Sequence, residues 1–362
     1  MKKIVEKLNR KSNIELLRIL AMIMIIAHHY CLYGGWNKIT GLNLNNAILD
    51  FLVIGGKIGV AIFILIFGYF GVKSKFSLKK LIRLILQVVF YTVIFETINI
   101  AINGWTGIKE VIKMCFPTTF SVYWFMTAYC VLYLISPYIN KLFNNLNKKE
   151  LKRLLIIMGV LSCGVITTIF QVNRGINDLF VFVFLYILGA YISTYCKEKR
   201  FKYGLVVAIA SYLLIFATQL IFEVKFTNHI NYFITLYSLP IITCAVMLVL
   251  YFKDVNIQST VINTMASATL GVYLIHENKF VRSLLWTKIL KSDSFYNKPT
   301  LILHALGSIL IIYVVCTIIE LLRKFIVEKT VLPLVYKVYD KLVEKIKHTK
   351  LYKKWEVIWK II

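Results

Sequence analysis

Charged residues are scarce in this chain, and acidic ones are the scarcest. Of its 362 residues 17% are charged, with 17 Asp and Glu against 43 Lys and Arg. Soluble globular domains carry about 25% charged residues. This deficit, together with 59% hydrophobic residues gathered in long blocks, excludes an ordinary soluble domain. The blocks predict an integral membrane protein, because each approaches the roughly 20 apolar residues that span a bilayer.

The chain also lacks the patterns of several other protein classes. Its seven cysteines have no metal-ligand spacing, and most lie in apolar segments, so we expect neither a metal site nor a disulfide framework. The net charge of +26 does not indicate nucleic-acid binding, because the basic residues fall between the apolar blocks. We expect no cleavable signal peptide and no second soluble domain.

What the sequence does contain is ten apolar segments of spanning length. They are residues 13–34, 49–72, 80–103, 120–142, 152–172, 178–196, 204–223, 229–252, 262–286 and 300–326. They predict an all-α fold, a polytopic membrane bundle of about ten transmembrane helices. Glycine and Lys57 interrupt the second segment, and His276 and Glu277 interrupt the ninth. Interrupted segments are often those that line a cavity.

Loop charges predict how the bundle is oriented in the cell membrane. The loops after the second, fourth and sixth segments are rich in Lys and Arg, and the alternate loops are poor in them. The positive-inside rule then places the N-terminus in the cytoplasm, and ten spans return the C-terminus there. We assign residues 1–330 to the transmembrane domain. Residues 331–362 are predicted to form a basic amphipathic tail on the anionic leaflet, the alternative being a solvated basic tail.

Two ionisable residues share one face of the first segment. Ten residues separate Arg18 from His29, and eleven helical steps bring the second within about 20° of the first and about 16 Å along the axis. His28 points roughly 80° away, and we expect it to pack rather than to react. Ionisable residues inside a membrane are functional candidates by default. The simpler alternative for Arg18 is an ion pair with Glu15 on the same helix.

Further ionisable side chains are expected in the outer half of the bundle, near His29. They are Glu96, His276, Glu277 and Lys57. A neutral histidine can take a proton from a hydroxyl while a carboxylate orients it, and a deeper arginine can hold an anionic group. This layout suits transfer of an activated acyl group to an alcohol across the membrane. As alternatives, Glu96 serves structure or a proton relay, and Lys57 extends to the membrane interface.

Aromatic residues open the fourth segment at the expected outer face. Tyr123 and Trp124 are predicted to contact the substrate by stacking on a sugar ring, and Lys57 is expected to contact the substrate as well. The more common role of such residues is an aromatic belt at the membrane interface.

The order of motifs resembles the acyltransferase-3 family of membrane O-acyltransferases over nearly the whole chain. The resemblance rests on the Arg18 and His29 spacing, the glycine- and phenylalanine-rich stretch 56–70, the basic Lys79, Lys80 and Arg83, the aromatic stretch 123–137, and the stretch 271–276 ending in His276. Residues 1–330 would then be an acyltransferase-3 transmembrane domain.

The resemblance implies acetyl-CoA from the cytoplasm as donor substrate and a hydroxyl of a cell-surface or lipid-linked polysaccharide as acceptor. Arg18 and His29 match the family's essential pair, and His276 its late histidine. We expect Arg18 and Arg83 to contact the donor. We expect no metal and no nucleic-acid partner, with membrane lipid as the surroundings, and we leave the oligomeric state open.

Two positions depart from the family pattern. Phe67 stands where many relatives have serine, and Tyr129 stands where a large branch has a glutamate proposed to pair with the histidine. Glu96 or Glu277 would then supply the carboxylate. The pattern resembles a branch found in capsule and exopolysaccharide loci of low-GC Gram-positive bacteria, which favours a surface polysaccharide. The alternative is a transporter or exporter of a glycan precursor or small polar solute, using the same charges as a proton relay.

Overall fold

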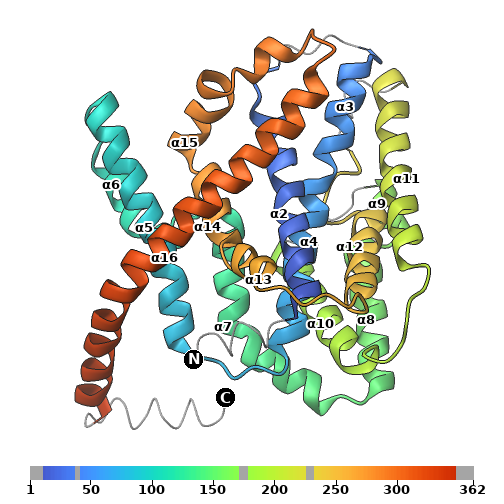
Figure 1. Cartoon of the computed structure of the whole chain (residues 1–362). Coiled ribbons are helices and arrows are strands. Elements are labelled where there is room, and N and C mark those ends of the chain that lie inside the picture. Colours follow the sequence, from blue (N-terminus) through green and yellow to red (C-terminus); the bar gives the residue numbers. More distant parts are fainter. Residues whose placement is uncertain (1–10, 37–40, 171–177, 226–231, 348–362) are drawn as a thin grey trace.

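The protein is a bundle of helices in the computed structural model, which describes residues 11–36, 41–170, 178–225 and 232–347 (Figure 1). Seven helical stretches are long and apolar enough to cross a membrane. They are α2 (Ser12–Tyr33), α3 (Leu44–Val53) with α4 (Gly55–Gly71), α5 (Leu78–Asn103), α8 (Lys148–Cys163) with α9 (Val165–Phe170), α10 (Asp178–Tyr195), α11 (Gly204–Lys225) and α16 (Leu301–Lys347). No strand occurs in the described residues, and the all-α membrane bundle is confirmed.

The remaining helices are shorter, more polar or broken. The fourth and eighth predicted segments correspond to α7 (Trp124–Asn145) and to α12 (Leu239–Phe252), which has 14 residues. The ninth is divided into α13 (Thr260–Ala266), α14 (Thr269–His276), α15 (Lys279–Leu284) and the π-helix η3 (Leu285–Ile289). Two short elements, α6 (Ile108–Cys115) and the 3-10 helix η4 (Ser292–Phe295), lie outside the ten predicted segments.

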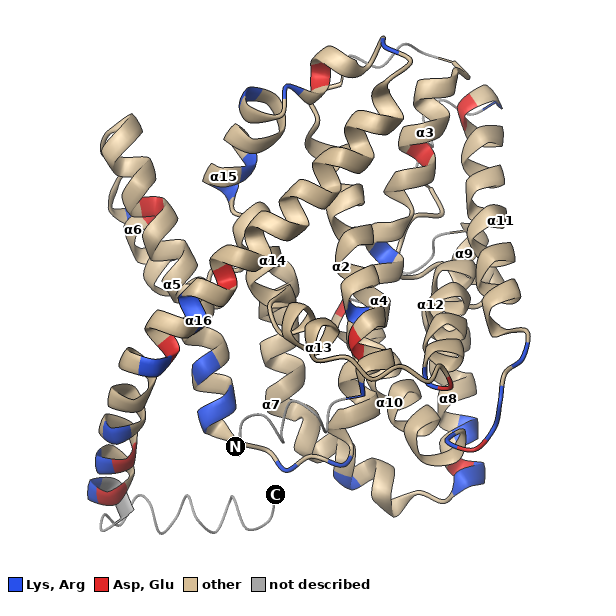
Figure 2. Ribbon diagram, in the orientation of Figure 1, with Lys and Arg blue, Asp and Glu red and all other residues tan. Residues whose placement is uncertain are grey.

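Lys and Arg crowd one end of the bundle, where α5 begins, α7 meets α8 and α16 ends (Figure 2). The predicted orientation depends on this asymmetry of charge. The helix α16 continues without a break beyond residue 330 as far as Lys347. Residues 348–362 of the predicted tail lie outside the described residues.

Glycines bring three central helices into close contact. A Cβ atom at Gly68 would lie 1.9 Å from the carbonyl oxygen of Tyr186 on α10, and one at Gly189 would lie 2.1 Å from that of Leu65 on α4. A Cβ atom at Gly59 would lie 2.6 Å from the Ala21 carbonyl oxygen on α2. Small residues at such crossings let helix backbones approach closely in a membrane. The helix α4 is thereby held between α2 and α10.

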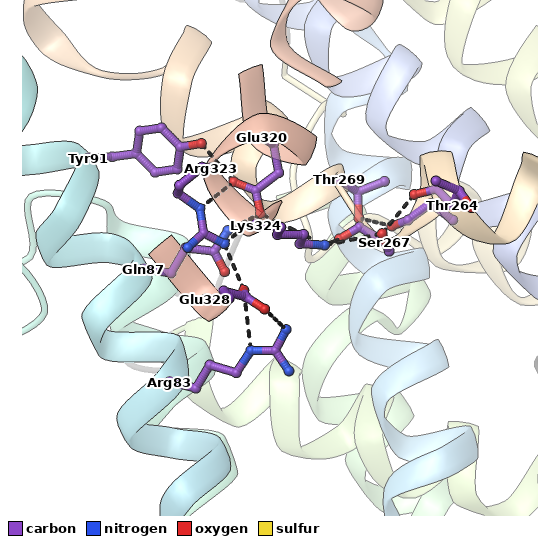
Figure 3. Close-up of polar contacts among 11 residues, drawn as sticks. Arg83, Gln87, Tyr91, Thr264, Ser267, Thr269, Glu320, Arg323, Lys324 and Glu328 are labelled. Atoms are coloured by element: carbon purple, nitrogen blue, oxygen red, sulfur yellow. Dashed lines mark hydrogen bonds and ion pairs between the residues drawn. The ribbon is translucent and has the colours of Figure 1, made fainter. Parts of the chain in front are cut away.

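A buried ionic cluster joins α5 to α16 where the two helices cross (Figure 3). Glu320 is fully buried and accepts hydrogen bonds from Gln87 (3.0 Å) and Tyr91 (2.6 Å) on α5. Arg323 donates to both Glu320 carboxylate oxygens at 2.8 Å. Lys324 reaches from the same helix to the Ser267 carbonyl, which links the cluster to the turn between α13 and α14. Because a buried charge is costly unless paired, this cluster fixes the crossing.

Replacing the central carboxylate of this cluster is expected to destabilise the bundle strongly. The substitution Glu320→Gln leaves the buried Arg323 and the half-buried Lys324 with less compensating charge, at a cost of about 3–5 kcal/mol. Thermal unfolding of the purified protein in detergent measures the effect. Lys79→Ala is the control, because Lys79 forms an exposed ion pair with Asp340 and such pairs contribute at most about 1 kcal/mol. Equal losses of stability in the two variants would contradict the structural role given to Glu320.

Candidate active site

A single cavity of about 750 Å³ connects the two residues that the sequence places on one face of α2. Arg18 and Lys80 line it together with Ser267, and His29 and Glu277 line it too. Eleven helical steps separate Arg18 from His29, so the two lie about 16 Å apart along the axis. The cavity therefore has an Arg18 end and a His29 end. Both interrupted segments, α4 and the broken stretch α13 to α15, contribute to its wall, as their interruptions predicted.

Three ionisable side chains meet at the His29 end. The Nδ1 atom of His29 lies 2.9 Å from Nε2 of His276 and 3.2 Å from Oε2 of Glu277. His276 and Glu277 occupy the last turn and the C-cap of α14. They reach the bundle interior because the ninth segment breaks there, and Asn278 starts α15 by accepting from the Phe280 backbone N–H. Without this break the helix would continue past residue 277, and His276 and Glu277 would not lie at a helix end beside His29.

The hydrogen bonds determine which ring nitrogens carry protons when both imidazoles are neutral. Nδ1 of His276 lies 2.6 Å from the Val272 carbonyl oxygen, which only accepts, so this nitrogen carries the proton. Nε2 of His276 is then an acceptor, and Nδ1–H of His29 donates to it. The lone pair on Nε2 of His29 is left available to accept a proton. His29 therefore has the tautomer of a general base.

The Glu277 carboxylate is held by two further side chains. Tyr33 donates to its Oε1 atom at 3.1 Å, and Arg282 donates to the same atom at 3.0 Å. Arg282 also donates to the Tyr33 hydroxyl at 2.8 Å, with its guanidinium 4.3 Å from the Tyr33 ring centroid. The fixed carboxylate stands where a protonated His29 would need an opposite charge.

Sequence reasoning missed Tyr33 and Arg282. Tyr33 lies four residues after His29, so helical periodicity already placed it one turn away on the same face. Arg282 follows Glu277 across a helix break, and no local periodicity predicts that contact.

Arg18 both pairs on its helix and faces the cavity. Its Nη1 atom lies 3.2 Å from Glu15 Oε1, and its guanidinium lies 5.8 Å from the Phe70 ring centroid. The ion pair with Glu15, which was the simpler alternative for Arg18, is therefore present. Arg18 nevertheless lines the cavity. Lys80 adds a second cation to this end.

The predicted substrate contacts divide between the cavity and the core. Lys57 and Trp124 line the cavity, with the ammonium 5.3 Å from the indole ring. Tyr123 is buried, donates to the Leu274 carbonyl at 2.9 Å and accepts from Asn278 at 3.0 Å. Tyr123 thus supports the end of α14 and is absent from the cavity wall.

Two other predicted site residues lie away from the cavity. Glu96 accepts hydrogen bonds from Thr106 at 2.6 Å and from Asn99 at 3.4 Å, near the end of α5. Arg83 forms an ion pair with Glu328 at 2.5 Å in the cluster of Figure 3. Neither side chain lines the cavity, so the structure brings Glu277, rather than Glu96, to His29.

The acyltransferase-3 family model, described as an acyltransferase domain, matches residues 11–321. The match covers most of the chain, and the protein belongs to this family. With its apolar helices, it is a multi-pass membrane acyltransferase. Comparison with curated proteins and with solved structures found no match.

The two carboxylate candidates can be separated by matched substitutions. Glu277→Gln removes the charge beside His29 while keeping the side-chain shape, and we expect acyl transfer to fall by roughly 10²–10⁴-fold. Glu96→Gln makes the same change in a half-buried carboxylate outside the cavity, and we expect transfer to be retained. The turnover number of each purified variant, with its amount in the membrane as a folding control, gives the answer. Loss of activity in Glu96→Gln alone would reverse the assignment.

Proposed function

We propose that this protein is an O-acetyltransferase that moves an acetyl group from acetyl-CoA to a hydroxyl of a cell-surface or lipid-linked polysaccharide. The observation that carries the proposal is His29, oriented by His276 and Glu277 in a cavity that also contains Arg18. Membership of the acyltransferase-3 family supports the reaction class.

In the proposed reaction His29 is the general base. Its Nε2 atom takes the proton of the acceptor hydroxyl as the hydroxyl oxygen attacks the thioester carbonyl carbon. The carbon–sulfur bond breaks, the ester bond forms, and the imidazolium returns the proton to the departing thiolate. Glu277, 3.2 Å from Nδ1, stabilises the imidazolium between these steps. His276 keeps the ring in the reactive tautomer by accepting from Nδ1.

The Arg18 end suits the anionic part of the donor. Arg18 and Lys80 are the cations there, and guanidinium and ammonium groups are the usual partners of phosphate. The distance of about 16 Å from Arg18 to His29 along α2 lets an extended chain bring its thioester to the histidine. Lys80 takes the donor-binding role expected of Arg83, whose charge Glu328 compensates.

The predicted orientation gives the two ends different access. With both termini in the cytoplasm, the Arg18 end faces the cytoplasmic pool of donor and the His29 end faces the outer leaflet. The acceptor hydroxyl then arrives from the outside. The proposal therefore includes transfer of the acetyl group through the bundle along the face that Arg18 and His29 share.

Replacement of His29 tests this function. We expect His29→Ala to reduce transfer of acetyl label from acetyl-CoA to the cell-surface glycan to a small residual rate, because it removes the imidazole that His276 and Glu277 orient in the cavity. The protein should still insert and accumulate. His28→Asn is the neighbouring control, because His28 is bonded through Nδ1 to the Val53 carbonyl at 2.5 Å. Normal acetyl content in the glycan from His29→Ala cells would overturn the proposal, and solute movement without a donor would favour a transporter.

A further inference from the structure

We propose that the acceptor is an anionic sugar, whose charged group binds Lys57 while its ring stacks on Trp124. This inference rests on the proposed function, because it names the acceptor class of the same cavity. It depends on the charge at the His29 end and on an ammonium that lies over the ring of a partly exposed indole.

Charge at the His29 end is not balanced by the side chains that line it. The cations there are Lys57 and Arg282, and the carboxylate is Glu277. Arg282 is bonded to Glu277 at 3.0 Å, so these two charges compensate each other. Within the described residues no ion pair is formed by Lys57, and Asp178 acts on it at longer range while accepting the Tyr237 hydroxyl at 2.8 Å. Lys57 therefore adds positive charge to the cavity.

Lys57 lies on the catalytic side of the cavity. It follows Gly56, at which a Cβ atom would lie 2.2 Å from Cγ of His28, so Lys57 belongs to the part of α4 that packs against α2 next to His29. An ammonium inside a membrane bundle is costly, and such groups mark ligand pathways more often than they serve packing. A ligand anion bound by Lys57 would hold the neighbouring part of the same sugar near Nε2 of His29.

Trp124 supplies the apolar half of the subsite. Its side chain begins α7, is 38% exposed and lines the cavity beside the Lys57 ammonium. A flat, exposed indole offers a broad apolar surface, and the C–H face of a pyranose ring can pack against it. Ligand sites combine such apolar walls with a few placed polar groups that fix orientation. One ammonium beside one indole therefore fits an acidic pyranose.

The donor phosphates are a poorer match for Lys57. Arg18 and Lys80 already serve the other end of the cavity, about 16 Å away along α2. A phosphate at Lys57 would place the donor's anionic end beside His29, where the thioester has to lie. The anionic group that binds Lys57 at the His29 end is therefore that of the acceptor.

Matched acceptor probes test the inference on the full chain in proteoliposomes. The probes are 4-nitrophenyl β-D-glucuronide, its neutral methyl ester, and 4-nitrophenyl β-D-glucoside 6-phosphate. The first two offer the same hydroxyls and differ in charge, and the third separates a phosphate from a carboxylate. We expect the wild-type KM for one of the two anionic probes to be at least about tenfold below that for the ester, as for a hydrogen bond to a charged group.

Substitution of Lys57 supplies the matched variants. Lys57→Gln is expected to abolish the preference, so that its ratio of KM values for anionic and neutral probes approaches one. Lys57→Arg keeps the charge and should keep most of the preference. Equal KM values in the wild type, or a preference that survives Lys57→Gln, would overturn the inference.

Binding without the donor separates this inference from the proposed reaction. Isothermal titration calorimetry with each probe reports on the subsite even where no acetyl transfer takes place. If the wild type binds an anionic probe and Lys57→Gln does not, the subsite is supported. Failure of acetyl transfer in the same preparation would count against the acetyltransferase alone. Absence of anionic binding in the wild type would overturn the subsite, whatever the outcome of transfer.

Discussion

The hydrogen bond from His29 to His276 is the interaction on which the rest of the site depends. It joins residues 247 positions apart, on the first spanning helix and on a broken helix near the end of the chain. The helix α14 must end at the depth of His29, and its neighbours hold it there. Tyr123 bonds to its last turn, and a Cβ atom at Gly271 would lie 2.3 Å from the Glu320 carboxylate, so α14 packs closely on α16.

The two departures from the family pattern lie against each other. The ring centroids of Phe67 and Tyr129 are 4.6 Å apart, and both side chains line the cavity. An aromatic pair thus occupies the two positions at which the family resemblance led us to expect a serine and a glutamate. Glu277 stands beside His29 with Tyr33 and Arg282 around it. The carboxylate of the site therefore comes from the residue next to the late histidine.

The sequence predicted helices, and the faces of single helices, better than it predicted contacts between them. Periodicity placed Arg18 and His29 on one face, and both line the cavity. The predicted depth in the membrane did not distinguish Glu96 from Glu277 as the carboxylate beside His29. Hydropathy does not determine how a helix is rotated toward its neighbours. The same limit applies to Arg83, which turns toward Glu328 on α16. The end of α14 falls at His276 and Glu277, where the sequence already interrupts the ninth segment. The break between α13 and α14 has no such signal, and it depends on tertiary packing.

The most direct test of the account is a double-mutant cycle between His29 and Glu277. If Glu277 acts by orienting His29 and stabilising its cation, the two substitutions act on one step and their effects are not additive. We predict that His29→Ala combined with Glu277→Gln transfers acetyl groups no more slowly than His29→Ala alone. A double variant whose loss equals the product of the two single losses would contradict the coupling between the histidine and the carboxylate.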